Sequence, residues 1–138
     1  MSERRCLRCK TVPLTEASPP DQRIAFFECP SCQRHYALLP GKQLTFRWMH
    51  PISLALYPVQ FDQSPSGRAA EVAASLVRER PAEQLELFAR EIRLELEEPT
   101  QQMCDILDCQ ASESELRAFL GSVAGEVEAF LLGQRPGS

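Results

Sequence analysis

The chain has 138 residues, of which 43% are hydrophobic and 25% charged, and its formal net charge is −4 at pH 7. These values are ordinary for a soluble globular protein of one domain or two small ones. No apolar run approaches the roughly 20 residues that cross a bilayer, and the start of the chain lacks the apolar core of a signal peptide. We therefore expect a cytoplasmic protein with no membrane contact.

Charge is divided unevenly along the chain. Residues 1–50 carry eight Lys/Arg and four Asp/Glu, a balance of +4, whereas residues 51–138 carry seven Arg and fifteen Asp/Glu, a balance of −8. Phosphate backbones repel an acidic surface. The acidic second part therefore argues against a protein that wraps a nucleic acid with its whole surface.

Two Cys-x-x-Cys pairs organise the first part of the chain. Cys6 and Cys9 form one pair, Cys29 and Cys32 form the other, and 19 residues (10–28) separate them. A thiolate pair two residues apart can close a tight turn around one metal ion, and two such turns give a closed tetrahedral shell of four sulfurs. The spacing therefore predicts one structural Zn²⁺ ion bound by these four cysteines, with no open position for catalysis.

In these cysteines and their turns, residues 4–48 resemble the zinc-ribbon family. The resemblance implies a small antiparallel ribbon whose zinc ligands are Cys6, Cys9, Cys29 and Cys32. Ribbons of this family often have a glycine directly after the second cysteine of each pair, where φ is often positive. Lys10 and Gln33 stand at these positions, so the same backbone would cost some strain here.

Other interpretations of the four cysteines are open. A disulfide pair would require an oxidising compartment. An iron site of the rubredoxin type uses similar turns, normally with the glycines that are missing here. A thioredoxin-like redox pair would place one Cys-x-x-Cys at a helix N-terminus after a strand. His35 is a further candidate ligand because it follows Cys32 by three residues, although four sulfurs already fill the shell.

Between and after the cysteine pairs, the sequence predicts a three- or four-stranded antiparallel sheet. Strands are expected within residues 12–15, 24–28, 35–39 and 43–48, with a loop at 17–21 and a turn at 40–42. In the last strand Leu44, Phe46 and Trp48 alternate with polar residues, so we expect them on one face. His50 is expected to be an ordinary boundary residue.

A strongly apolar stretch, residues 51–61, follows the predicted sheet and contains Pro51 and Pro58. A flexible linker would be polar, and proline interrupts regular structure. We therefore predict an apolar connector, residues 51–65, which packs on the domains and includes a short helix from Pro51 to Tyr57. The alternative is an exposed patch that binds a partner.

Residues 66–133 predict an acidic domain of three or four helices. Ser64 is a plausible N-cap for a first helix that begins at Pro65. Pro81 and Pro99 bound a second helix, which we expect to be central, and a short helix should cover 101–107. Ser112 and Glu115 fit a capping box at the start of the last helix. Its predicted buried stripe is Leu116, Phe119, Leu120, Val123, Val127, Phe130 and Leu131.

The acidic residues of the second helix are interpreted as a solvated face. This set contains Glu83, Glu86, Glu91, Glu95, Glu97 and Glu98.

Two further cysteines, Cys104 and Cys109, lie five residues apart, about 140° round a helix. We expect both to be small core residues, with a redox pair, a second metal site or a reactive thiol as alternatives. Residues 101–120 also have a faint helix-turn-helix pattern. Because Glu113 and Glu115 would face phosphates there, an ordinary helix hairpin is expected. No phosphate-binding glycine loop or Ser/His/Asp set is found, which disfavours an enzyme.

The sequence thus predicts an α+β protein with an N-terminal antiparallel zinc ribbon (1–50), an apolar connector (51–65) and a C-terminal helical bundle (66–133). The leading hypothesis is a small intracellular zinc-binding adaptor whose partner is another protein or a second copy of the chain.

The second hypothesis is nucleic-acid binding or transcription-linked regulation by the basic ribbon, whose charge would be about +2 with zinc bound. The acidic net charge disfavours it. A third hypothesis is an enzyme that uses Cys104 or Cys109. The candidate nucleic-acid contacts are Arg4, Arg5, Arg8, Arg34, Lys42, Arg47 and Trp48.

Overall fold

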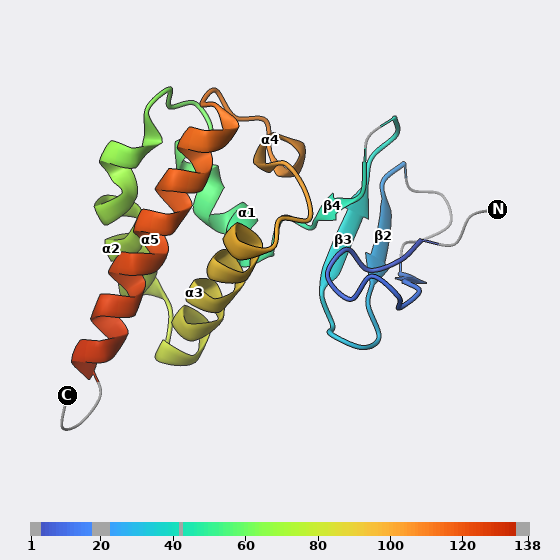
Figure 1. Cartoon of the computed structure of the whole chain (residues 1–138), viewed down its shortest axis with the longest axis horizontal. Helices are drawn as coiled ribbons and strands as arrows, with labels where there is room; N and C mark the ends of the chain where they lie inside the picture. The colour runs from blue at the N-terminus through green and yellow to red at the C-terminus, as the bar shows by residue number, and fades with distance from the viewer. Residues whose placement is uncertain (1–3, 18–22, 42, 135–138) are drawn as a thin grey trace. The chain divides into compact units, whose positions relative to one another are not determined.

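The computed structural model describes residues 4–17, 23–41 and 43–134. The chain divides into two compact units, residues 1–50 and 51–138, the first built on strands and the second on helices (Figure 1). Lys42, most of the loop expected at 17–21 and the tail after Gln134 lie outside the described residues.

The first unit, called the strand unit below, is a four-stranded antiparallel sheet. Its strands are β1 (Thr15–Glu16), β2 (Ala25–Glu28), β3 (His35–Leu38) and β4 (Thr45–Phe46), in the order β1-β2-β3-β4. Figure 1 shows β2 and β3 side by side. The predicted antiparallel sheet is confirmed.

The last strand is shorter than predicted, and its side chains do not alternate as expected. The chain turns after β4, where the His50 N–H donates to the Arg47 carbonyl at 2.9 Å. Trp48 is therefore 55% exposed while Phe46 is 3% exposed, and Leu44 is half-buried. The prediction that these three share one buried face is wrong, because strand alternation stops at Phe46.

A column of stacked rings fills one face of this sheet. Tyr36 lies opposite Phe46 in the β3–β4 register, and their rings stack with centroids 5.5 Å apart. His50 stacks on the other side of Phe46, with centroids 3.6 Å apart, and is buried. His50 is thus part of the core of the strand unit and not an ordinary boundary residue.

The second unit, called the helical unit below, begins with the apolar stretch. Residues Pro51–Leu56 form helix α1, and Tyr57–Val59 form the 3₁₀ turn η1. Ile52, Leu56 and Val59 are fully buried. The stretch expected to connect the domains therefore contributes core side chains to the helical unit.

Four more α-helices follow, so the described residues contain five. A 3₁₀ turn, η2 (Pro65–Arg68), leads into α2 (Ala69–Glu79), which precedes α3 (Ala82–Glu97), α4 (Met103–Ile106) and α5 (Glu113–Gln134). Ser64 is the N-cap residue of η2 and Pro65 follows it, as predicted, although the Ser64 side chain makes no capping hydrogen bond. At α5, the Glu115 N–H donates to Ser112 Oγ at 3.3 Å, which is one half of the predicted capping box.

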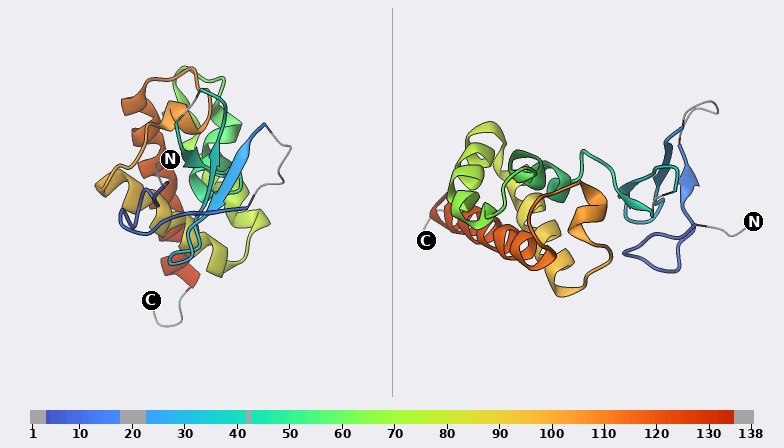
Figure 2. Two further views of the ribbon diagram at one scale, coloured as in Figure 1. Left: turned by 90° about the vertical axis from the view of Figure 1, so that its right-hand side faces the viewer. Right: turned by 90° about the horizontal axis from the view of Figure 1, so that it is seen from above.

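Helix α5, and not α3 as expected, is the centre of the helical unit. It packs most extensively against α3 and α2 and also touches α1, α4 and η2, and the views in Figures 1 and 2 agree in placing it beside α2 and α3. In α3, Leu87 is 38% exposed, so the wide apolar face of that helix is only partly covered. The predicted stripe of α5 is buried except at Phe130, which is 36% exposed.

The acidic face predicted for α3 contains two residues that are not solvated. Glu91 is 6% exposed and Glu95 is 1% exposed. The Glu95 carboxylate accepts hydrogen bonds from Thr100 N–H at 2.6 Å, Thr100 Oγ1–H at 2.7 Å and Gln101 N–H at 3.3 Å. The interpretation of Glu91 and Glu95 as surface residues is wrong. At Glu95 the reason is that the loop after Pro99 folds back over this end of α3.

Candidate metal centre

The first cysteine pair lies in a tight turn between residues 6 and 12. The Lys10 N–H donates to the Cys6 carbonyl at 2.8 Å, and the Cys6 N–H donates to the Val12 carbonyl at 2.9 Å. The Cys9 N–H points at Cys6 Sγ, at 3.4 Å. An N–H aimed at a sulfur stabilises negative charge there, so this backbone favours a thiolate.

The second pair repeats this geometry at the end of β2. The Gln33 N–H donates to the Cys29 carbonyl at 2.8 Å, and the Cys29 N–H donates to the Arg34 carbonyl at 3.0 Å. The Cys32 N–H lies 3.5 Å from Cys29 Sγ. Two turns distant in sequence thus present their sulfurs in the same way.

Both turns contain the strained backbone that the family resemblance implies. Lys10 has a φ of 68° and Gln33 a φ of 63°, values that favour glycine. Each of these residues follows the second cysteine of its pair. The strain is kept at two equivalent positions, which is typical of backbone held in place by a site.

The four sulfurs form one cluster. Cys6 Sγ lies 3.7 Å from Cys32 Sγ, and Cys29 Sγ lies 3.9 Å from Cys9 Sγ. All four ligand atoms are within 4.8 Å of one another. A tetrahedral shell with metal–sulfur bonds of about 2.3 Å has sulfur–sulfur edges of about 3.8 Å. The cluster could therefore hold a metal ion such as zinc, and the cysteines are free thiols, not disulfides.

The cysteines of the cluster differ in acidity. Burial acts to raise the pKa of Cys6, but hydrogen bonds from the Tyr36 hydroxyl and nearby backbone N–H groups outweigh it and lower that pKa to about 7. Burial and the neighbouring thiols raise the pKa of Cys9 to about 12. Burial raises the pKa of Cys32 as well. The raised pKa values keep Cys9 and Cys32 protonated at neutral pH, so a metal ion that binds here would displace their protons.

Tyr36 supports the cluster from the sheet, a role that the sequence pattern alone does not predict. Its side chain is fully buried, and its hydroxyl oxygen lies 3.2 Å from Cys6 Sγ. Burial and the contact with Cys6 raise the pKa of Tyr36. The hydroxyl therefore stays protonated and can donate a hydrogen bond to a thiolate. The alternation of β3 predicts only which face Tyr36 occupies, and not the cysteine 30 residues earlier that it meets.

His35 is not brought into the cluster. It is exposed, and its Nε2 lies 3.9 Å from a carboxylate oxygen of Glu28 on the neighbouring strand. Among the residues that the structure describes, the one group of Cys, His, Asp and Glu side chains placed to hold a metal is the set of four cysteines.

The remaining cysteines are not core residues, contrary to the prediction. Cys104 is exposed and Cys109 is half-buried. Burial raises the pKa of Cys104 and raises that of Cys109 to about 11. Thiols with raised pKa values are weak nucleophiles at neutral pH, so neither has the character of a catalytic cysteine.

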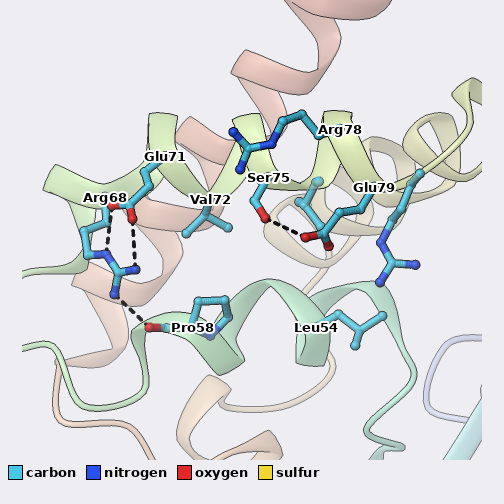
Figure 3. Close-up of a pocket in the computed structure, with 10 residues that line it drawn as sticks. Leu54, Pro58, Arg68, Glu71, Val72, Ser75, Arg78 and Glu79 are labelled. Atoms are coloured by element: carbon cyan, nitrogen blue, oxygen red, sulfur yellow. Dashed lines mark hydrogen bonds and ion pairs between the residues drawn. The ribbon is translucent and has the colours of Figure 1, made fainter.

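A hollow of about 240 Å³ lies on the helical unit between α1 and α2 (Figure 3). Several of the polar groups that line it are bonded to one another. Arg68 bonds to Glu71 at 3.2 Å and to the Pro58 carbonyl at 2.8 Å, and Ser75 donates to Glu79 at 3.2 Å.

The described residues define an α+β protein, with a four-strand antiparallel sheet, five α-helices and four cysteines that could hold a metal ion. Comparisons with models of protein families, with curated proteins and with solved structures return no match for this chain. Within the described part of the chain, no helix is both long and apolar enough to span a bilayer.

Proposed function

We propose that the strand unit is a zinc-ribbon module that holds one structural Zn²⁺ ion through Cys6, Cys9, Cys29 and Cys32. The observation that carries this proposal is the closed cluster, with sulfur–sulfur distances of 3.7 and 3.9 Å. Four thiolates complete the tetrahedral shell that zinc prefers. No coordination position remains for a substrate, so the ion stabilises the fold and does not catalyse a reaction.

The small core of the strand unit supports a structural role for the ion. Few of its described side chains are buried, and Cys6 and Cys29 are among them. Units of about 50 residues rarely stabilise themselves by apolar burial alone. Structural zinc in a site of this kind contributes on the order of 10 kcal/mol of folding free energy.

With a structural metal, the function we propose for the whole chain is binding: an intracellular adaptor whose partner is another protein or a second copy of the chain. Trp48 and Met49, 55% and 70% exposed, support this, since exposed aromatic and Met side chains are typical of interfaces.

Metal analysis of protein purified without chelators tests the proposal. We expect one zinc per chain, and we expect Co²⁺ substitution to give the intense sulfur-to-metal absorption of a tetrahedral thiolate site. A preparation that is folded but holds no metal, or holds iron, would contradict the zinc assignment.

Replacing Tyr36 with Phe should weaken zinc binding by about tenfold, because hydrogen-bonding partners of metal ligands typically contribute that much. Competition with a zinc chelator measures the change. Tyr57, which is 65% exposed in the helical unit, gives the matched Tyr→Phe control, with no effect expected. Equal zinc affinity in the two variants would show that the Tyr36 hydroxyl does not support the site.

The second candidate function is nucleic-acid binding by the strand unit. The observation in its favour is a surface on which Arg47 lies against exposed Trp48, with the guanidinium carbon 4.9 Å from the ring centroid. Binding of mixed-sequence oligonucleotides that weakens steeply with salt is the expected behaviour.

A further inference from the structure

An open hollow of about 470 Å³ lies on the strand unit. It is lined by Arg23, Ile24, Phe26, Arg47 and Trp48. Two of these residues are cations, three are apolar, and none is an anion. Such a surface can bind an anion through its arginines and a flat apolar group through its aromatic rings.

The register of the sheet explains how the lining comes together. Phe26 on β2 and Thr45 on β4 both lie opposite Ala37 of β3, so they share a face. The Arg47 N–H continues the β4 ladder by donating to the His35 carbonyl at 3.1 Å, which places Arg47 on that face too. Ala37 lies on β3, between β2 and β4. Its side chain is small, which leaves room for Arg47 to reach across to Phe26.

The aromatic and cationic groups hold one another in place. The Arg47 guanidinium carbon lies 4.2 Å from the Phe26 ring centroid, and the Phe26 and Trp48 rings meet edge to face, with centroids 5.2 Å apart and an angle of 81°. Contacts of both kinds are favourable. They orient Trp48, whose side chain remains 55% exposed, so a ligand would not have to order it.

We propose that this hollow binds single-stranded nucleic acid, with one base stacked on Trp48 and flanking phosphates at Arg23 and Arg47. The inference rests on the second candidate function and names its site and its class of ligand. Binding of single strands characteristically combines cations along the backbone with aromatic rings that stack on bases. Stacking requires an unpaired base, so a duplex cannot use Trp48 in this way.

The charge of the chain limits the length of the strand that fits. The residues after His50 carry a balance of −8, which repels a long polyanion. Short strands that touch only the strand unit avoid this repulsion. An acidic peptide would complement the arginines as well, but it lacks the base plane that the exposed Trp48 ring would stack on.

Trp48 is the only tryptophan in the chain, so its fluorescence reports on the hollow directly. The experiment titrates the zinc-loaded full-length protein with an oligothymidylate of ten nucleotides in 20 mM NaCl. Parallel titrations use a hairpin duplex and polyglutamate. We expect quenching by the single strand and little change with the other two. Zinc is quantified in the same sample.

Variants are compared by the anisotropy of a labelled oligothymidylate. Trp48→Ala should weaken binding about tenfold, the contribution of one stacked base, whereas Phe61→Ala, at an exposed aromatic residue of the helical unit, should leave binding unchanged. Arg23→Gln should reduce the slope of log K against log salt concentration by about 0.7, the value for one phosphate contact on a single strand. Arg90→Gln on α3 is its control and should not alter the slope.

Several results would overturn the inference: no binding in 20 mM NaCl, binding without a change in Trp48 fluorescence, or equal effects of Trp48→Ala and Phe61→Ala. Quenching by polyglutamate equal to that by oligothymidylate would also overturn it and would assign the hollow to an acidic polypeptide. If the sample contains one zinc per chain but binds no strand, this inference fails and the structural-zinc proposal stands.

Discussion

Replacing Cys29 with Ser should abolish stoichiometric zinc binding and unfold the strand unit. Cys29 is fully buried, and its sulfur lies 3.9 Å from that of Cys9 within the cluster. A neutral hydroxyl is a poor zinc ligand, so three thiolates would remain around an ion that needs four donors. The unit would lose most of a stabilisation on the order of 10 kcal/mol. Metal analysis and residue-resolved amide hydrogen exchange measure the two effects.

The same chemical change at Cys104 is the matched control. Cys104 is exposed and lies outside the cluster, so Cys104→Ser should keep one zinc per chain and change stability by less than about 0.5 kcal/mol. In Cys29→Ser, amides of α2, α3 and α5 should stay protected because the buried side chains of the helical unit form a core of their own. If Cys29→Ser retained one zinc and native protection of β2 and β3, the cluster would not be the feature that stabilises the strand unit.

The cysteine cluster could be predicted from the sequence because its geometry is local. Two residues between cysteines fix each turn, and a hairpin of 19 residues is enough to join the turns. The residues that support the cluster could not be predicted in this way. Tyr36 meets Cys6, and His50 meets Phe46, through strand register and a turn after β4. Neither contact can be predicted from the spacing of residues in the sequence.

The helical unit shows a similar division. The 3.6-residue period correctly predicts the buried positions of α5 from Leu116 to Val127. In α3, Leu85, Phe88 and Ile92 recur at the same period and are buried as well. What fails there is the interpretation of the acidic residues as a solvated face, because Glu91 and Glu95 are buried. Helix α3 packs against both α1 and α5, and the loop after it returns to cover Glu95. A tertiary contact of that kind is invisible to a helical period, which describes one helix at a time.

Replacing Glu95 with Ala should therefore destabilise the helical unit by about 3 kcal/mol. The carboxylate accepts two backbone N–H groups, from Thr100 and Gln101, and the Thr100 hydroxyl. A buried donor left without a partner costs about 1–3 kcal/mol. Urea unfolding followed by far-UV circular dichroism measures the loss, since the helical unit holds the α-helices.

Two further substitutions distinguish the effect of losing these hydrogen bonds from the effect of losing one negative charge on α3. Glu86→Ala, at an exposed position of the same helix, should change stability by less than about 0.5 kcal/mol. Glu95→Gln keeps the shape and one acceptor oxygen, so its effect should lie between those of the two alanine variants. If Glu95→Ala and Glu86→Ala were equally stable, the carboxylate would not hold the loop after α3. The two acidic residues would then contribute equally little to stability, as residues on a solvated face do.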